Sequence, residues 1–93
     1  MDLDMIAANL ETIEDRLQEL EEEKRDSEHA LGRLLQHPPA LYPELVGQQM
    51  QELRNRIRRL EQRISGLLRA KEALIVSGAS RVALAFNRDP PGN

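Results

Sequence analysis

The chain has 93 residues, of which 31% are charged, 40% hydrophobic and 2% aromatic, with no cysteine and a net charge of −3. This size allows one small domain, the few aromatics argue against a compact β-sandwich or α/β core, and the lack of cysteine excludes disulfides and thiolate zinc sites. No run approaches the roughly 18 apolar residues of a membrane span, and the acidic start is unlike a basic secretory signal, so we expect a cytoplasmic protein without membrane insertion.

The first predicted element is a helix over residues 3–36. Asp2 or Asp4 can cap its N-terminus, and it must end before the prolines of the segment 37–43, which cannot continue a helix. Its apolar positions recur in steps of four and three, the period of a coiled-coil seam. This seam comprises Ile6, Leu10, Ile13, Leu17, Leu20, Leu31 and Leu34, with the polar residues Lys24 and Ser27 between Leu20 and Leu31.

A loop over 37–42 leads to a second helix over residues 43–77. Pro43 suits the first position of a helix, Glu44 favours the positive end of the helix dipole, and Ser77-Gly78 is a typical C-terminal stop. This helix carries a seam of the same period, formed by Val46, Met50, Leu53, Ile57, Leu60, Ile64, Leu67, Lys71 and Leu74.

The two seams face each other if the helices run antiparallel. In such a hairpin, paired residue numbers have a near-constant sum, and the pairs Leu34 with Val46 and Ile6 with Leu74 both sum to 80. The sequence therefore predicts an all-α fold, an antiparallel two-helix coiled-coil hairpin over 1–78 with a short C-terminal tail over 79–93. The polar seam residues are either register-fixing positions or points that open toward a partner.

Charge divides unevenly between the two helices. Residues 1–37 carry 11 acidic and 4 basic side chains, whereas residues 43–77 carry 4 acidic and 7 basic ones. We expect these charges to pair within the hairpin, and the lack of aromatics for base stacking disfavours the alternative of nucleic-acid binding. The expected partners are Arg54, Arg56, Arg58, Arg59 and Arg63 on one side, and Glu19, Glu21, Glu22, Glu23, Asp26 and Glu28 on the other.

Catalytic and metal-binding patterns are not found in the sequence. His29 and His37 lie eight residues apart and lack the spacing of a zinc motif, and there is no glycine-rich phosphate loop. A two-helix hairpin also encloses no cleft in which pKa values are tuned. We therefore expect no enzyme activity, no metal and no cofactor.

Apolar residues outside the seam are the strongest functional signal. Two helices alone bury little surface, so a surplus apolar face predicts a covering partner, either a second copy or another protein. The tail residues are expected to form a short helix capped by Ser80 or an extended strip, followed by a disordered end. The predicted partner-binding residues are Leu3, Ala7, Leu68, Ile75, Val76, Val82, Leu84 and Phe86, and a second group at the loop end comprises Leu35, Leu41, Tyr42 and Leu45.

The loop motif Pro39-Ala40-Leu41-Tyr42 and the helix end Leu74-Ile75-Val76-Ser77 resemble the small helical-hairpin co-chaperones of bacterial type III secretion, the YscE and SsaE-like group. The similarity covers about residues 15–77, and the extension over 78–93 departs from it. The resemblance implies a bacterial cytoplasmic protein that binds a tetratricopeptide-type chaperone and, with it, an exported needle or translocator subunit. The alternatives are a self-assembling four-helix bundle of two copies and, less favoured, a nucleic-acid-binding hairpin.

Overall fold

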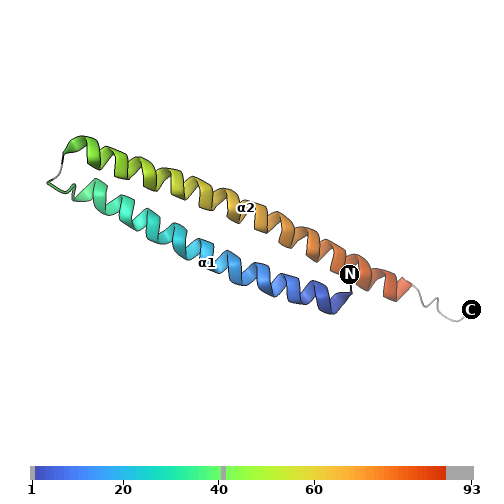
Figure 1. Ribbon diagram of the computed structural model, residues 1–93. Helices are drawn as coiled ribbons and strands as arrows, with labels where there is room; N and C mark the ends of the chain where they lie inside the picture. Colours follow the sequence, from blue (N-terminus) through green and yellow to red (C-terminus); the bar gives the residue numbers. More distant parts are fainter. Residues whose placement is uncertain (1, 41, 88–93) are drawn as a thin grey trace, which may run out of the picture.

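The computed structural model describes residues 2–40 and 42–87, with the backbone alone for residues 85–87. It consists of two helices, α1 (Leu3–Gln36) and α2 (Pro43–Asn87), which lie side by side and run antiparallel (Figure 1). The described residues contain no strand. The structure therefore confirms the predicted all-α helical hairpin.

The N-terminus of α1 is closed by the first of the two expected capping residues. The Met5 backbone N–H donates to the Asp2 carboxylate at 2.8 Å, and the Ile6 N–H donates to the Asp2 carbonyl at 3.0 Å. At the other end, the His37 N–H donates to the Arg33 carbonyl at 2.8 Å before the prolines begin. Both ends of α1 thus satisfy backbone groups that the helix itself leaves without partners.

Helix α2 begins at Pro43, as the sequence predicts. A proline is favoured there because its missing N–H would have had no partner within the helix. The Tyr42 carbonyl accepts the first bonds of the helix, from the Leu45 N–H at 3.0 Å and the Val46 N–H at 3.3 Å. The short connection forces the chain to reverse, which makes the two helices antiparallel neighbours.

The predicted end of α2 at Ser77-Gly78 is wrong. The helix continues to Asn87, so Ser80 lies in its interior and caps nothing, and residues 79–87 are helical rather than a separate tail. None of the glycines in the described part of the chain has a positive φ angle, which a glycine stop requires. No proline occurs between Gly78 and Asn87, and the alanines and leucine there favour a helix, which outweighs the cost of one glycine of about 1 kcal/mol. The predicted disordered end over 89–93 lies outside the described residues.

The structure places every seam position between the two helices. The best-buried cluster lies near the middle, where Leu17, Leu20, Leu60 and Ile64 pack together and Ile13 and Leu67 pack against them. The buried seam residues are Ile6, Leu17, Leu20, Ser27, Val46, Leu60 and Ile64. The half-buried ones are Leu10, Ile13, Lys24, Leu31, Leu34, Met50, Leu53, Ile57, Leu67, Lys71 and Leu74.

Candidate docking surface

The two seam lysines each reach across to the opposite helix. Lys24 Nζ lies 3.8 Å from Glu61 Oε1, and Lys71 Nζ lies 3.5 Å from Glu14 Oε1. In both pairs the residue numbers sum to 85. The first pair joins a lysine of α1 to a glutamate of α2, and the second joins a lysine of α2 to a glutamate of α1. The stems stay in the seam while the amines reach its edge, where the glutamates lie. The sequence analysis did not predict Glu14 and Glu61 as partners of the seam lysines. The signal that could have found them is the equal sum of the residue numbers in the two lysine–glutamate pairs.

Ser27 is the uncharged polar residue of the seam, and its side chain is buried. Its exposed fraction is 4%, and its hydroxyl donates to the Glu23 carbonyl of the preceding turn at 2.9 Å. The bond satisfies the hydroxyl within α1, so Ser27 fits the seam without a partner from outside. The small side chain also leaves less apolar packing at this level than a leucine would provide.

Three apolar side chains lie on one side of α2 outside the seam, with the exposed Glu72 between the first two. Leu68, Ile75 and Val82 follow one another at intervals of seven residues, so they lie on the same side of the helix. They are 48%, 50% and 42% exposed, respectively. We call these three residues the apolar stripe. Ala79 lies four residues after Ile75 and three before Val82, which is the spacing of a coiled-coil seam. The stripe therefore has the pattern of a helix-packing surface.

Two other predicted partner-binding residues of α2, Val76 and Leu84, do not share this face. Successive residues of a helix are about 100° apart, so Val76 lies about 100° around from Ile75, and Leu84 lies on nearly the opposite side from Val82. Both are exposed. The Phe86 side chain lies outside the described residues.

On α1, Leu3 and Ala7 are exposed and lie at the level of the stripe. The position of a Cβ on Gly78 would be 3.6 Å from Ile6 Cγ2, which places this start of α1 beside the last turns of α2 that it covers. These exposed apolar residues therefore lie together at the end of the hairpin away from the loop, on the stripe and on the adjacent turns of α1.

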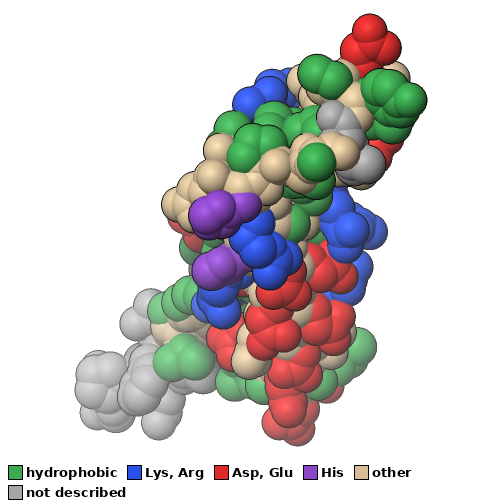
Figure 2. Space-filling model, turned by 90° about the vertical axis from the view of Figure 1, so that its left-hand side faces the viewer, with side chains coloured by type: hydrophobic (Ala, Val, Ile, Leu, Met, Phe, Trp, Pro, Cys, Tyr) green, Lys and Arg blue, Asp and Glu red, His purple; other side chains and the backbone are tan. Residues whose placement is uncertain are grey.

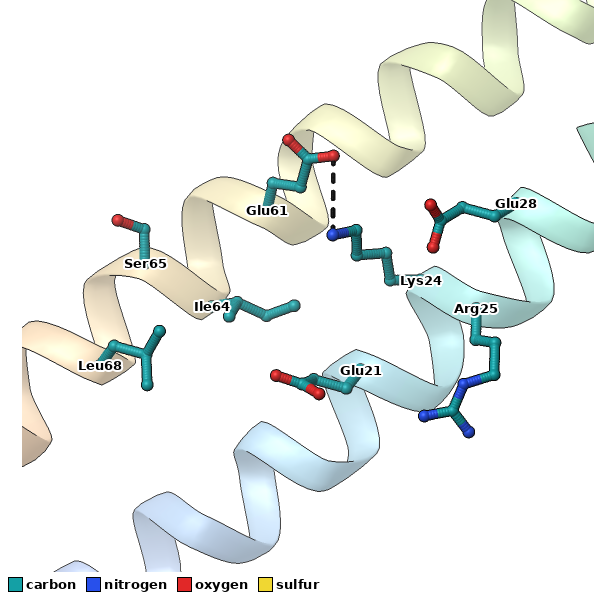
Figure 3. A pocket seen from close by; sticks show the side chains of 8 residues that line it. All are labelled: Glu21, Lys24, Arg25, Glu28, Glu61, Ile64, Ser65 and Leu68. Atoms are coloured by element: carbon teal, nitrogen blue, oxygen red, sulfur yellow. Dashed lines mark ion pairs between the residues drawn. The ribbon is translucent and has the colours of Figure 1, made fainter.

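A shallow groove extends the same side of the hairpin toward the loop (Figure 3). Ile64 and Leu68 border it on α2, and Lys24 crosses it from α1 toward Glu61. The other lining residues are Glu21, Arg25, Glu28 and Ser65. The groove is lined by both apolar and charged side chains, so a helix lying along this side would meet apolar contacts at the open end and charges toward the loop.

The second predicted apolar group lies at the loop end and is also exposed. Leu35 and Leu45 are about half exposed, Tyr42 is 77% exposed, and Leu41 lies outside the described residues. These residues come from the end of α1, the loop and the first turn of α2. They form no row with helical spacing, in contrast to the stripe.

The expected direct pairing of the arginines with the acidic run is wrong. Among the described residues, none of Arg54, Arg56, Arg58, Arg59 and Arg63 has a carboxylate within 4.0 Å. The register explains part of this result, because Arg63 lies at the level of Arg16, a like charge. Arg16 itself pairs with Glu19 on its own helix at 2.8 Å.

His29 and His37 are both exposed, and the part of the chain that the structure describes contains no cluster of three or more potential metal ligands. Neither helix has, within its described residues, a stretch long and apolar enough to cross a membrane. The class of protein that these observations define is an all-α two-helix hairpin with an unpartnered apolar face. No protein-family model, curated protein or solved structure matches the chain.

Proposed function

We propose that this protein is a non-enzymatic binding module that docks on another protein through the apolar stripe. The observation that carries the proposal is the seven-residue spacing of Leu68, Ile75 and Val82 on one exposed side of α2. An amphipathic helix of a partner packs against such a row in the same way as the two helices pack against each other.

The free energy available from the stripe is adequate for specific recognition. Burying an aliphatic side chain completely yields about 1.5–3 kcal/mol, and the stripe residues are about half exposed, so each can contribute about 1 kcal/mol on docking. Neighbouring contacts with Leu3 and Ala7 of α1 enlarge the interface. The partner gains as well, because an apolar helix face that would promote its aggregation becomes covered.

The resemblance to type III secretion co-chaperones supports a more specific form of this proposal. The hairpin acts in the bacterial cytoplasm and binds a tetratricopeptide-type chaperone, with which it holds an exported needle or translocator subunit before secretion. A grooved, all-helical chaperone offers the kind of surface on which a hairpin can lay one helix face.

The experiment combines co-purification with a stripe variant. Tagged wild-type protein, expressed in its native cell, is expected to retain a tetratricopeptide-type protein in fixed stoichiometry. The double variant Leu68→Asp, Ile75→Asp should retain at least tenfold less of it, because two carboxylates would be buried in an apolar interface. Circular dichroism should show unchanged helicity, since both residues lie outside the seam.

Val76→Asp is the matched control. Val76 is somewhat more exposed than the stripe residues and lies on a different side of α2, so this variant should retain the partner as the wild type does. Equal retention by the stripe variant and the wild type would show that the assigned face is wrong. Retention of a partner that is not a chaperone would contradict the co-chaperone role and leave the docking face intact.

A further inference from the structure

Three arginines form an unpaired basic row on α2. Arg56, Arg59 and Arg63 are spaced by three and four residues, so they follow one side of the helix, and all three are exposed. They border a groove together with Glu23 and Leu60. Three guanidinium groups against one carboxylate give this groove a local charge of +2. We call these residues the arginine row.

The groove continues toward the loop with a partly apolar floor. Arg56 and Arg59 also border the adjoining hollow, which is lined in addition by Leu34, Gln49, Glu52 and Leu53. This side of the hairpin is opposite the groove of Figure 3. The α2 residues that line it outside the seam directly precede seam positions, whereas Glu61 and Leu68 directly follow them. The arginine row and the apolar stripe are therefore independent surfaces.

Helix α1 carries a complementary acidic row. Asp15, Glu19, Glu22 and Asp26 are spaced by four, three and four residues and are all exposed. Glu19 pairs with Arg16 of its own helix, and none of the other three is part of an ion pair among the described residues. On the face drawn in Figure 2, acidic side chains gather in a continuous patch with basic side chains beside it.

The two rows lie at the same height along the hairpin. Leu20 packs with Leu60 in the central cluster, and paired residues sum to about 80, so residues 15–26 of α1 span the same length as residues 54–65 of α2. The arginine row, residues 56–63, falls within that length. Among the described residues, no ion pair joins the two rows within one hairpin.

We propose that the occupant of the arginine row is the acidic row of a second copy of this chain. The two hairpins stack face to face and point the same way, so that α1 of each lies on α2 of the other. A two-fold axis parallel to the long axis generates this arrangement and forms the contact between acidic and arginine rows twice. If the axis were perpendicular, α1 would lie on α1 and α2 on α2, and like charges would meet along the interface.

Charge complementarity thus selects both the partner and its direction. Individual exposed ion pairs are weak, so the dimer depends on the number of pairs and on low ionic strength. The proposal goes beyond the docking function, because the apolar stripe stays uncovered in the dimer and remains available to another protein.

Sedimentation equilibrium of the pure full-length protein tests the dimer. At about 0.05 M salt, the average mass should rise with concentration from 10.6 kDa toward twice that value. At about 0.5 M salt it should return to the monomer value, because the Debye length becomes shorter than the distances between the rows. A wild-type protein that stays monomeric at low salt up to millimolar concentration would overturn the proposal.

A charge-swap pair tests the contact itself. The variants Arg56→Glu, Arg63→Glu and Glu22→Arg, Asp26→Arg should each be monomeric alone, because each replaces attraction by repulsion. Mixed in equal amounts, they should form a heterodimer, since the acidic α1 of the first faces the basic α2 of the second and the reverse also holds. Arg58→Glu, Arg69→Glu is the control with the same change in net charge outside the row, and it should dimerise as the wild type does.

The outcomes separate this surface from others. Self-association that persists in either row variant, or a folded mixture that stays monomeric, would contradict the proposal. Loss of dimer in Leu68→Asp, Ile75→Asp would contradict it too, because the contact would then lie on the stripe. If Arg56→Glu, Arg63→Glu loses helicity, Arg56→Gln, Arg63→Gln adds no repulsion within the hairpin and should still weaken the dimer at least tenfold.

Discussion

Gly78 lies in the interior of α2 at a position that the sequence marks as a helix end. A Cβ added there would make an ordinary van der Waals contact of 3.6 Å with Ile6 Cγ2, and Gly78 itself has no positive φ angle. We expect Gly78→Ala to raise the free energy of unfolding by about 0.5–1 kcal/mol, because alanine loses less backbone entropy in a helix. Urea denaturation followed by circular dichroism measures the change.

Gly66→Ala is the control for this substitution. A Cβ on Gly66 would meet no atom within 4 Å, and the residue lies in the middle of α2, so this variant should gain a similar free energy. If Gly78→Ala destabilises the protein while Gly66→Ala stabilises it, residue 78 adopts the left-handed conformation of a helix stop. That result would return the end of α2 to the place that the sequence suggests.

At the scale of the element, the last turns of α2 extend beyond α1 (Figure 1). Helix α1 begins at Leu3, three residues before Ile6, whose Cγ2 lies beside Gly78, so only the last turns of α2 lie past the part that α1 covers. Ala83→Pro should therefore disrupt these turns alone, since proline removes one hydrogen bond and clashes with residue 79. We expect a small loss of helicity, confined to the end of α2, and an unchanged midpoint of thermal unfolding.

Ser65→Pro makes the same backbone change inside the paired part of α2. There the helix is packed against α1, so the proline should cost about 3 kcal/mol or more and lower the midpoint strongly. An equally large loss from Ala83→Pro would mean that the last turns of α2 are packed, and that α2 has no unpartnered end in solution.

Helix limits differ in how readily they can be predicted from the sequence. The end of α1 and the start of α2 are predictable, because Pro38, Pro39 and Pro43 act through fixed local geometry. The end of α2 is not, because a glycine is compatible both with a stop and with a helix interior, and the helix propensity of the residues after Gly78 decides between them. The apolar stripe is visible as a surplus of apolar residues, but only helical geometry separates Leu68 and Ile75 from Leu84.

At the scale of the whole molecule, we expect the two lysine–glutamate pairs to stabilise the alignment of α1 with α2. Glu14→Lys with Glu61→Lys places like charges at both crossings, and should lower the free energy of unfolding by about 1 kcal/mol at low salt. Adding Lys24→Glu and Lys71→Glu restores opposite charges and should recover most of that loss. Chemical denaturation of the two variants measures both steps.

High salt provides the control, since screening should reduce the difference between these variants. A first variant that is as stable as the wild type at low salt would show that the pairs do not help to align the helices. The antiparallel register itself is predictable from the sequence, because the seam numbers of both helices sum to about 80 along their whole length. The lack of ion pairs between the arginines and the acidic run is not predictable in this way. The sum of residue numbers gives the position of Arg63 along the hairpin but not the direction of its side chain.

The loop and the open end of the hairpin differ in how much chain separates the residues that meet. The seam residues Leu34 and Val46 are 12 residues apart, whereas Ile6 and Gly78, which lie side by side at the open end, are 72 apart. Contacts near the loop therefore form at a lower cost in chain entropy, so we expect the hairpin to form from the loop and to open from the other end. The apolar stripe lies at that opening end, so a bound partner would hold the two helices together there. The lifetime of the complex and the lifetime of the closed hairpin would then depend on each other.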